Sequence, residues 1–336
     1  MPISDKKIYD LYIAARGSAA LAVGVKLGLF DALRTPLKAD ALAERFSLHP
    51  RGMNAILKSL SAADVLIFEQ DSQTYALTEE AQVYLLKDSD LDISGLIEME
   101  FHHFLTPEKL LAAAQHNAPS IYDNAGSDVW EQHQKDPAQA QRFTRAMHAI
   151  SAKPAEVLAQ QSFWNDIGKV LDVGAGSGAL SIAALKEHSH LHSGLMDLSE
   201  ICEIARLYVH KAGVEERCEF HSLNMFQDPF PQGYDAVLFS QILHDWNPKQ
   251  GRLLLSKALK TLPSGGRILI HEKLTEPSRN HGPLANALVN LDMLVWTEGQ
   301  QYSVELFSEM FKDLGIEDFE VIPTVGYWSC VVAYKS

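Results

Sequence analysis

Hydrophobic and polar positions follow two different periods along this chain, and the change of period divides it near residue 160. Upstream of that point apolar residues recur at helical spacing, most clearly in the Ala- and Leu-rich segment 8–33. Downstream, short apolar runs alternate with amphipathic helical segments, which is typical of a parallel sheet with helices on both faces. The pattern predicts an α/β chain with a mainly helical N-terminal part.

The N-terminal part has the pattern of a winged helix. Helices are expected at 40–46 and 51–66. A hairpin is expected where apolar runs at 65–68 and 74–77 flank a polar stretch. Thr78 is placed to act as the N-cap of the helix that follows.

Five parallel strands and a closing antiparallel hairpin are predicted downstream. The strands are expected at residues 169–173, 193–196, 218–223, 236–240 and 267–272, with helices between them at 179–187, 200–212 and 249–261. The hairpin is expected at residues 319–323 and 327–334, around Gly326. Such sheets bind ligands at the carboxyl ends of their strands. Four polar residues fall at or just beyond those ends, namely Asp172, Asp197, Asn224 and His244.

A glycine-rich turn follows the first of these strands, with the sequence Gly-Ala-Gly-Ser-Gly at 174–178. Its glycines allow positive φ and a close approach of the backbone to a bulky ligand. Asp197 ends the next strand, where it can accept from the two hydroxyls of a ribose. The G-x-G-x-G spacing, with no G-K-[ST] after it, differs from the dinucleotide fingerprint and the phosphate-binding loop. The pattern favours an adenosine-containing ligand such as S-adenosylmethionine over a tight turn without a ligand.

A second cluster, Ser-Gln-Ile-Leu-His-Asp-Trp at 240–246, follows another predicted strand. A histidine just past a strand end can act as a general base, and His244 holds that position. Glu272 ends a neighbouring strand and can accept from one imidazole nitrogen, which fixes the tautomer and raises basicity. The alternative is that His244 only begins a helix and that Glu272 is a solvent-exposed residue at the end of its strand, with no catalytic role for either.

Length and charge narrow the function classes. The chain of 336 residues is long enough for two domains with real cores, and its 46% of hydrophobic residues argues against disorder. The net charge of −14 disfavours a nucleic-acid partner, and the predicted winged helix has no basic footprint.

Three cysteines lie far apart without metal-ligand spacing and are expected to be reduced thiols of a cytoplasmic protein. The polar N-terminus lacks the apolar core of a signal peptide. No uninterrupted apolar run approaches membrane-spanning length, so no membrane partner is expected.

Seven stretches together carry a specific resemblance, and they lie at residues 27–33, 75–78, 143–147, 174–178, 224–226, 243–246 and 265–266. The chain resembles, over nearly its full length, the small-molecule O-methyltransferases of the hydroxyindole and caffeate type, which use S-adenosylmethionine. The His-Asp-Trp step at 244–246 is the most diagnostic stretch, because the glycine motif alone indicates only the methyltransferase superfamily.

The resemblance implies a doubly wound, mostly parallel, seven-stranded sheet of the class I methyltransferase, Rossmann-like type. This catalytic domain would cover 161–336, behind a winged-helix dimerisation domain at 1–105 and a helical connection at 106–160 that lines the acceptor pocket. It also implies S-adenosylmethionine as the cofactor, a small-molecule methyl acceptor and a homodimer.

The resemblance also assigns roles to individual residues. It implies that His244 is the base and Glu272 its partner. The implied cofactor-binding residues are Asp172, Gly174, Gly176, Asp197, Leu198, Asn224, Met225 and Ser240. The implied acceptor-binding residues are Phe143, Met147, Trp246, Asn290 and Met293.

Two positions depart from the family pattern. Asn224 stands where the family usually has Asp, and its amide is expected to offer an acceptor for the adenine amine. Gln301, or Tyr302 in a shifted alignment, stands where the family usually has a second Glu beside the histidine. The base is then polarised by one acid rather than two. This departure affects the identity of the methyl acceptor more than that of the cofactor.

The sequence therefore predicts O-methylation of a small aromatic or otherwise acidic metabolite. One alternative is C- or N-methylation, for example beside a 2-oxo acid carbonyl with metal assistance. Histidines at 102, 103, 148 and 271 are candidate donors, but they form no metal motif and no metal site is predicted. A winged-helix regulator that senses S-adenosylmethionine is the non-enzyme alternative, which the acidic charge and the His244–Glu272 pair disfavour.

Overall fold

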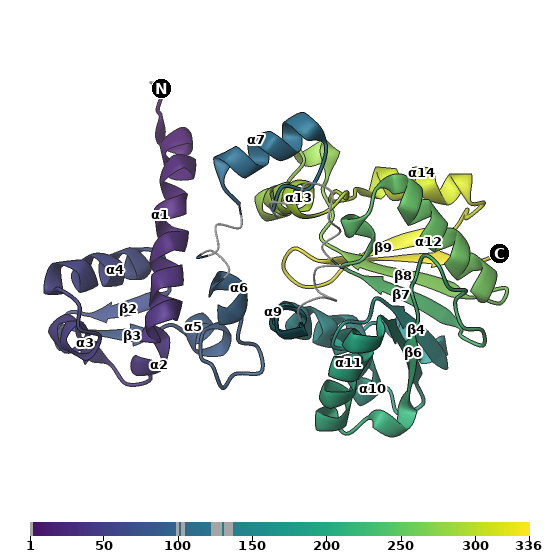
Figure 1. Cartoon of the computed structure of the whole chain (residues 1–336), viewed down its shortest axis with the longest axis horizontal. Helices are drawn as coiled ribbons and strands as arrows, with labels where there is room; N and C mark the ends of the chain where they lie inside the picture. Colours follow the sequence, from purple (N-terminus) through teal and green to yellow (C-terminus); the bar gives the residue numbers. More distant parts are fainter. Residues whose placement is uncertain (1–2, 99–100, 102–104, 122–129, 131–136) are drawn as a thin grey trace. The chain divides into compact units, whose positions relative to one another are not determined.

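The computed structural model describes residues 3–98, 101, 105–121, 130 and 137–336. The chain divides into two compact units, Met1–Phe104 and Leu105–Ser336. Figure 1 colours the first from purple to blue and the second from blue through green to yellow. His102 and His103, considered above as metal donors, lie outside the described residues.

The N-terminal unit has the predicted order of helix, turn, helix and hairpin. Its elements are α1 (Lys6–Leu27), α2 (Leu29–Ala32), β1 (Leu37–Lys38), α3 (Ala39–Arg45), α4 (Pro50–Ala62), β2 (Leu66–Glu69), β3 (Thr74–Leu77), α5 (Glu79–Tyr84) and α6 (Ser94–Glu98). The strands pair antiparallel in the order β1-β3-β2. The hydroxyl of Thr78 accepts the Ala81 N–H at 3.2 Å, as expected of an N-cap.

The helix predicted over 8–33 is interrupted near its C-terminus. Gly28 adopts φ 71°, a left-handed conformation that glycine accepts without a Cβ penalty, and ends α1 there. The chain restarts as α2 and turns Leu29 and Phe30 into the core of this unit, where they are 0% and 1% exposed. The apolar stretch therefore forms two helices, α1 and α2, rather than one.

The first half of α1 leaves large apolar side chains uncovered. Ile8, Leu11 and Tyr12 are 78%, 62% and 61% exposed. In the described part of the chain, α1 is the one helix long and apolar enough to cross a membrane, although Asp10 and Arg16 interrupt it. A helix that buries an apolar face against another protein chain meets the same criterion.

The C-terminal unit is built on a seven-stranded sheet in the order β6-β5-β4-β7-β8-β10-β9, which confirms the predicted α/β fold. Its strands are β4 (Lys169–Val173), β5 (His192–Asp197), β6 (Cys218–Ser222), β7 (Ala236–Ser240), β8 (Arg267–Glu272), β9 (Phe319–Pro323) and β10 (Ser329–Tyr334). The β10 strand runs antiparallel to β8 and β9, and all the other pairs are parallel.

Helices cover both faces of this sheet (Figure 1). The helices of this unit are α7 (Pro107–His116), α9 (Pro137–Ala159), η2 (Ser162–Asp166), α10 (Ala179–Glu187), α11 (Ser199–Ala212), η3 (Glu215–Arg217), η4 (Leu243–Asp245), α12 (Pro248–Thr261), η5 (Pro277–Arg279), α13 (Leu284–Trp296) and α14 (Val304–Asp313). One core cluster joins the sheet to α9, α10 and α11. The other joins its opposite face to α12 and α14.

The strand order places a switch point between β4 and β7. The chain runs outward from β4 through β5 to β6, and then returns to the other side of β4 with β7 and β8. In such sheets the crevice for a ligand opens at the carboxyl ends of the strands beside this point. The turns that follow β4, β5, β7 and β8 therefore meet at one edge of the sheet.

Candidate active site

The carboxylate of Glu272, at the end of β8, holds the turn that follows β7. Its Oε1 accepts the backbone N–H groups of Ile242, Leu243 and His244 at 3.2, 3.1 and 3.4 Å. The Glu272 residue is only 1% exposed, so these donors replace the water that a buried carboxylate has lost. The contacts fix the backbone of His244 beside the end of β8.

The same carboxylate also approaches the imidazole. Glu272 Oε2 lies 3.0 Å from His244 Nδ1, and the Gln301 side-chain amide lies 2.9 Å from the same nitrogen. Glu272 Oε2 and Gln301 Oε1 have no other hydrogen bond within the described residues. Since an amide can turn end for end, the Gln301 oxygen can accept beside Glu272 from the single Nδ1–H. In the neutral imidazole this leaves Nε2 as the unprotonated nitrogen.

Charge around the imidazole favours its protonated form. Burial lowers the pKa of His244, but the carboxylates of Glu272 and Asp245 outweigh it and raise this pKa to about 9. Asp245 Oδ1 lies 3.6 Å from Nε2, and burial raises the pKa of Asp245 to about 7. The histidine gains a free base nitrogen only as the pH approaches its own pKa.

The segment 298–303 delivers Gln301 to this histidine. A Cβ on Gly299 would lie 1.8 Å from the carbonyl oxygen of His244, so only glycine permits the approach. Asn290 Oδ1 on α13 accepts the Gln301 N–H at 2.7 Å and anchors the segment from the other side.

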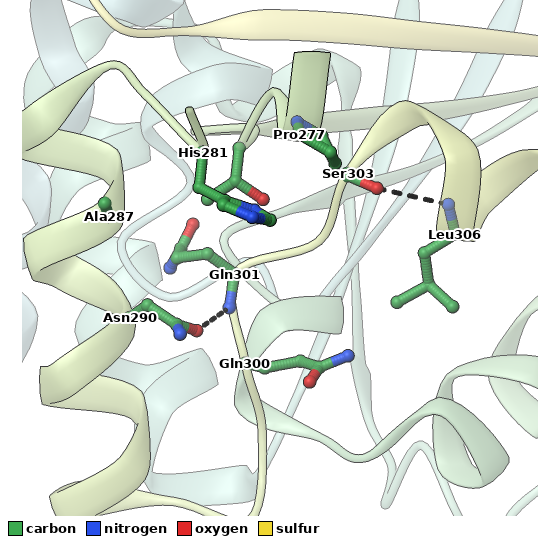
Figure 2. Close-up of a pocket in the computed structure, with 9 residues that line it drawn as sticks. Pro277, His281, Ala287, Asn290, Gln300, Gln301, Ser303 and Leu306 are labelled. Atoms are coloured by element: carbon green, nitrogen blue, oxygen red, sulfur yellow. Dashed lines mark hydrogen bonds between the residues drawn. The ribbon is translucent and has the colours of Figure 1, made fainter. Parts of the chain in front are cut away.

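A pocket of about 290 Å³ adjoins the same segment. It is lined by Thr275, Pro277, His281, Ala287, Asn290, Gln300, Gln301, Ser303 and Leu306. Figure 2 shows the bond from Gln301 N–H to Asn290 in its wall, and the bond from Leu306 N–H to Ser303 Oγ that caps α14. Gln301 thus belongs both to this polar pocket and to the surroundings of His244.

The three glycines of the turn after β4 differ in their surroundings. All have positive φ, at 69°, 57° and 77° for Gly174, Gly176 and Gly178. A Cβ on Gly174 would lie 2.3 Å from the Ile242 side chain, and one on Gly178 would lie 2.5 Å from the Leu195 side chain. A Cβ on Gly176 would meet nothing within 4 Å. Packing therefore explains two of these glycines, and only Gly176 borders open space.

Asp197, at the end of β5, lies beside that open space. Its Oδ2 accepts the Gly176 N–H at 2.8 Å, and its Oδ1 accepts the Leu198 N–H at 2.7 Å. Burial raises the pKa of Asp197 to about 6, although both N–H groups oppose the rise. Each carboxylate oxygen keeps a further acceptor position. Asp172 differs, because it is buried at the end of β4 and accepts the Ser181 hydroxyl at 2.7 Å.

Asn224 uses its side-chain oxygen within its own turn. Its Oδ1 accepts the N–H groups of Phe226 and Gln227 at 2.9 and 3.2 Å, which is an Asx-turn. Both lone pairs of this oxygen are therefore engaged, and the amide nitrogen is the group left to face a ligand. The expected acceptor for an adenine amine is not available in this arrangement.

Phe143 on α9, one of the residues implied for the acceptor, lies against Trp296 on α13, with ring centroids 5.6 Å apart. Trp296 is on the same helix as Met293, another implied acceptor residue. Met147 follows Phe143 by one helical turn. Trp246 packs against another aromatic residue, with its ring centroid 4.5 Å from that of Phe226. Phe226 directly follows Asn224 and Met225, two residues implied for the cofactor, so Trp246 lies close to that segment.

Sequence reasoning missed two hydrogen bonds that tie α9 to the loops of the site. His148 Nδ1 lies 2.7 Å from Ser177 Oγ in the glycine turn, and the Gln241 amide donates to Ser151 Oγ at 2.9 Å. The sequence indicates His148 only as a candidate metal donor. Within the described residues no three His, Cys, Asp or Glu side chains form a group that could hold a metal ion.

Comparison with known proteins gives consistent matches along the chain. The profile of the O-methyltransferase domain matches residues 108–317, and that of the O-methyltransferase dimerisation domain matches residues 9–87. The 3-hydroxy-5-methyl-1-naphthoate 3-O-methyltransferase of Streptomyces sahachiroi is 29% identical over 93% of this chain and 90% of its own length. The N,N-dimethyltransferase OxyT of Streptomyces rimosus is 28% identical over 81% and 79%.

A solved structure with a similar fold is human N-acetylserotonin methyltransferase in complex with SAM, with a TM-score of 0.87 and 23% identity. The match covers 100% of this chain and 99% of that one.

We predict that the first two glycines of the turn differ in their importance for stability. Gly174→Ala should lower the free energy of unfolding by about 2–4 kcal/mol, since it adds a clash with Ile242 to the cost of positive φ. Gly176→Ala should cost only about 1–2 kcal/mol, the cost of positive φ alone. Urea unfolding followed by circular dichroism measures both, and equal losses would contradict the packing argument.

Proposed function

The chain belongs to the O-methyltransferase family, and we propose that it methylates a hydroxyl group of a small aromatic or otherwise acidic metabolite, with His244 as general base. As a family member it is an S-adenosylmethionine-dependent methyltransferase. The observation that carries the proposal is the 3.0 Å approach of the buried Glu272 carboxylate to His244 Nδ1. This contact leaves Nε2 to take a proton.

The residues beside the glycine turn fit the cofactor. The open space over Gly176 borders a half-buried carboxylate, Asp197, whose oxygens each keep an acceptor position for a ribose hydroxyl. Trp246 and Phe226 offer aromatic faces next to Asn224, and Trp246 Nε1 is buried without a partner within the described residues. We propose that this end receives the adenine. The bound cofactor supplies an electrophilic sulfonium methyl group.

The proton transfer is best matched to a phenol. The acceptor O–H bond would break and its proton would go to His244 Nε2. The oxygen electron pair would form the bond to the methyl carbon, while the bond between sulfur and that carbon would break with its electron pair remaining on sulfur. A phenol has an unperturbed pKa of about 10. The pKa of His244 is raised to about 9, so the transfer is nearly balanced in energy. An aliphatic alcohol has a much higher pKa than His244, so proton transfer to this base would be strongly unfavourable.

Phe143, Met147, Asn290 and Met293 are proposed to hold the acceptor. The contact between Phe143 and Trp296 joins α9 to α13 and supports an aromatic wall on this side. Such a wall suits a flat ring, because aromatic surfaces stack with offset or edge contacts. The relative from Streptomyces sahachiroi is named for a naphthoate substrate, and a bicyclic phenol is a reasonable first acceptor to test.

Methylation of nitrogen is the second candidate. The relative from Streptomyces rimosus is named an N,N-dimethyltransferase, so a protein with similar sequence over most of its length acts on nitrogen. An amine needs a base only to remove a proton after or during transfer, and His244 would serve this role as well. Carbon methylation with metal assistance has no ligand group within the described residues.

We further propose that the protein is a homodimer formed through its N-terminal unit. The matched dimerisation domain covers residues 9–87, which include most of α1. The exposed apolar side chains Ile8, Leu11 and Tyr12 offer surface that an obligate interface would bury. The cytoplasmic location expected from the sequence stays a prediction.

A panel assay tests the proposed reaction. We expect transfer of labelled methyl from S-adenosylmethionine to naphthols or hydroxynaphthoates, with mass analysis placing the label on oxygen. The matching methyl ethers, which have no free hydroxyl, serve as negative controls. A label on nitrogen of an aminonaphthalene, with none on any hydroxyl, would favour the second candidate instead.

The pH dependence tests the base. Because only neutral His244 accepts a proton, kcat/KM should rise with pH and level off above about 9. His244→Ala should lower kcat by about 10²–10⁴. His210→Ala is the control, since that side chain is 82% exposed on α11.

Glu272→Gln removes a negative charge that stabilises the imidazolium, so it should lower the pKa of His244 and move the profile to lower pH. A profile that stays in place, or a fully active His244→Ala, would overturn this role of the histidine.

Light scattering tests the dimer. At micromolar concentration the wild-type protein should have twice the mass of one chain. Replacing both Ile8 and Tyr12 with Lys should shift it toward the monomer, because two charges would be buried in the interface. Leu207→Lys on α11, at a residue 66% exposed in the other unit, should leave the mass unchanged. A monomeric wild type would contradict the proposal.

A further inference from the structure

A partly buried lysine, Lys273, stands next to the proposed catalytic pair of His244 and Glu272. Lys273 follows Glu272 directly, and in the described part of the chain its ammonium makes no hydrogen bond and no ion pair. The head group lies 4.7 Å from the centre of the Trp328 ring. Burial lowers the pKa of Lys273, while the charges of Glu272 and Asp292 oppose this.

Strand register explains how the tryptophan comes to lie under the lysine. Ser329 on β10 pairs with Glu272 on β8, so the preceding Trp328 comes opposite Lys273. His271 lies diagonally across from the same tryptophan. Its ring stacks on that of Trp328, with centroids 4.8 Å apart and planes 18° apart. The two aromatic rings form a flat support beside the ammonium group.

His271 adds a second polar atom without a partner. The residue is 1% exposed, and its Nε2 has no hydrogen bond within the described residues. Its Nδ1 lies 3.2 Å from Ser240 Oγ. Burial and the charge of Lys273 lower the pKa of His271 to about 3, so its ring is neutral. Lys273 is therefore the cation of this cluster.

The cluster lies on the face of the sheet that α9 covers. Alternation along β8 puts Leu269, His271 and Lys273 on one face and Glu272 on the other. Leu269 belongs to the core cluster shared with α9. The same helix carries Phe143 and Met147, the residues proposed for the acceptor. The ammonium thus lies at the carboxyl end of β8 on the side where the ligands are expected.

We propose that Lys273, supported by Trp328 and His271, binds a carboxylate of a ligand of this site. The carboxylate belongs either to an aromatic acceptor or to the methionine part of the cofactor; this inference rests on the proposed function. A partly desolvated ammonium gains most from a charge-assisted hydrogen bond to an anion. Without such a cation, Glu272 and Asp245 would repel an acidic ligand.

Titration calorimetry tests the proposal without turnover. The binding probes are S-adenosylhomocysteine, 5′-methylthioadenosine (which lacks the amino-acid part), a hydroxynaphthoate and its carboxamide. The two aromatic probes are titrated with S-adenosylhomocysteine present. The variants are Lys273→Met, which removes the charge, and Lys273→Arg, which keeps it. Lys312→Met on α14 controls for the change in net charge, and thermal melting checks each fold.

Lys273→Met should weaken binding of one carboxylate probe about tenfold or more, with its uncharged counterpart unchanged and Lys273→Arg close to wild type. Loss for the hydroxynaphthoate assigns the site to the acceptor, and loss for S-adenosylhomocysteine assigns it to the cofactor. Affinities all within twofold in a stable variant would overturn the proposal.

If the Lys273→Met variant has a much lower melting temperature than the wild type, binding to the wild-type protein tests the proposal instead. Equal affinity for the hydroxynaphthoate and its carboxamide, together with equal affinity for the two adenosine probes, overturns the proposal. A clear preference for a carboxylate probe that Lys273→Arg retains supports it. Intact carboxylate binding with no methyl transfer to any hydroxyl would contradict the proposed function alone.

Discussion

One buried carboxylate, that of Glu272, organises the carboxyl edge of this sheet. Its first oxygen receives three successive backbone N–H groups, and its second meets the imidazole of His244. Losing it would leave three backbone donors unpaired, and each unpaired buried group costs about 1–3 kcal/mol. Gly299 completes the constraint, because its missing Cβ lets the next segment lie against the carbonyl of His244. Backbone and side chain of the histidine are thus fixed by one group.

The acidic residues at the carboxyl edge of the sheet have perturbed pKa values, and so does His244. Burial raises the pKa of Asp172 and Asp245 to about 7, so these two carboxyls are partly protonated near neutral pH, whereas Asp197, with a pKa of about 6, is mostly ionised there. The imidazole of His244 moves the opposite way and holds its proton to about 9. A positively charged sulfonium near this edge would favour ionised carboxylates and a neutral imidazole by simple Coulomb attraction and repulsion. In the proposed mechanism, cofactor binding and the deprotonation of His244 would therefore be coupled through the same charges.

The sequence predicted what depends on chain periodicity and strand ends. The sheet, the closing hairpin, the Thr78 cap and the meeting of Asp197, His244 and Glu272 at one edge follow from local pattern and the rules of parallel sheets. What it could not predict depends on neighbours distant in the chain. Asn224 and Asp are equivalent in a motif, but here the amide oxygen closes its own turn. Gly174 has the position of a ligand-binding glycine, although a Cβ there would also force the Ile242 side chain to move.

In the proposed mechanism the acceptor residues must hold a ring at a fixed distance from the cofactor methyl group and from His244, since reacting atoms need to approach to about 3–3.5 Å. The helix α9 carries Phe143 and Met147, and two side-chain bonds tie it to the rest of the site. His148 joins it to Ser177 of the glycine turn, and Ser151 joins it to Gln241, the residue after β7. Gln241 adopts φ 55°, so it already lies in a sharply bent backbone that leads to His244. One helix is thereby held to both the cofactor side and the base side, and a ring resting on it would be positioned against both.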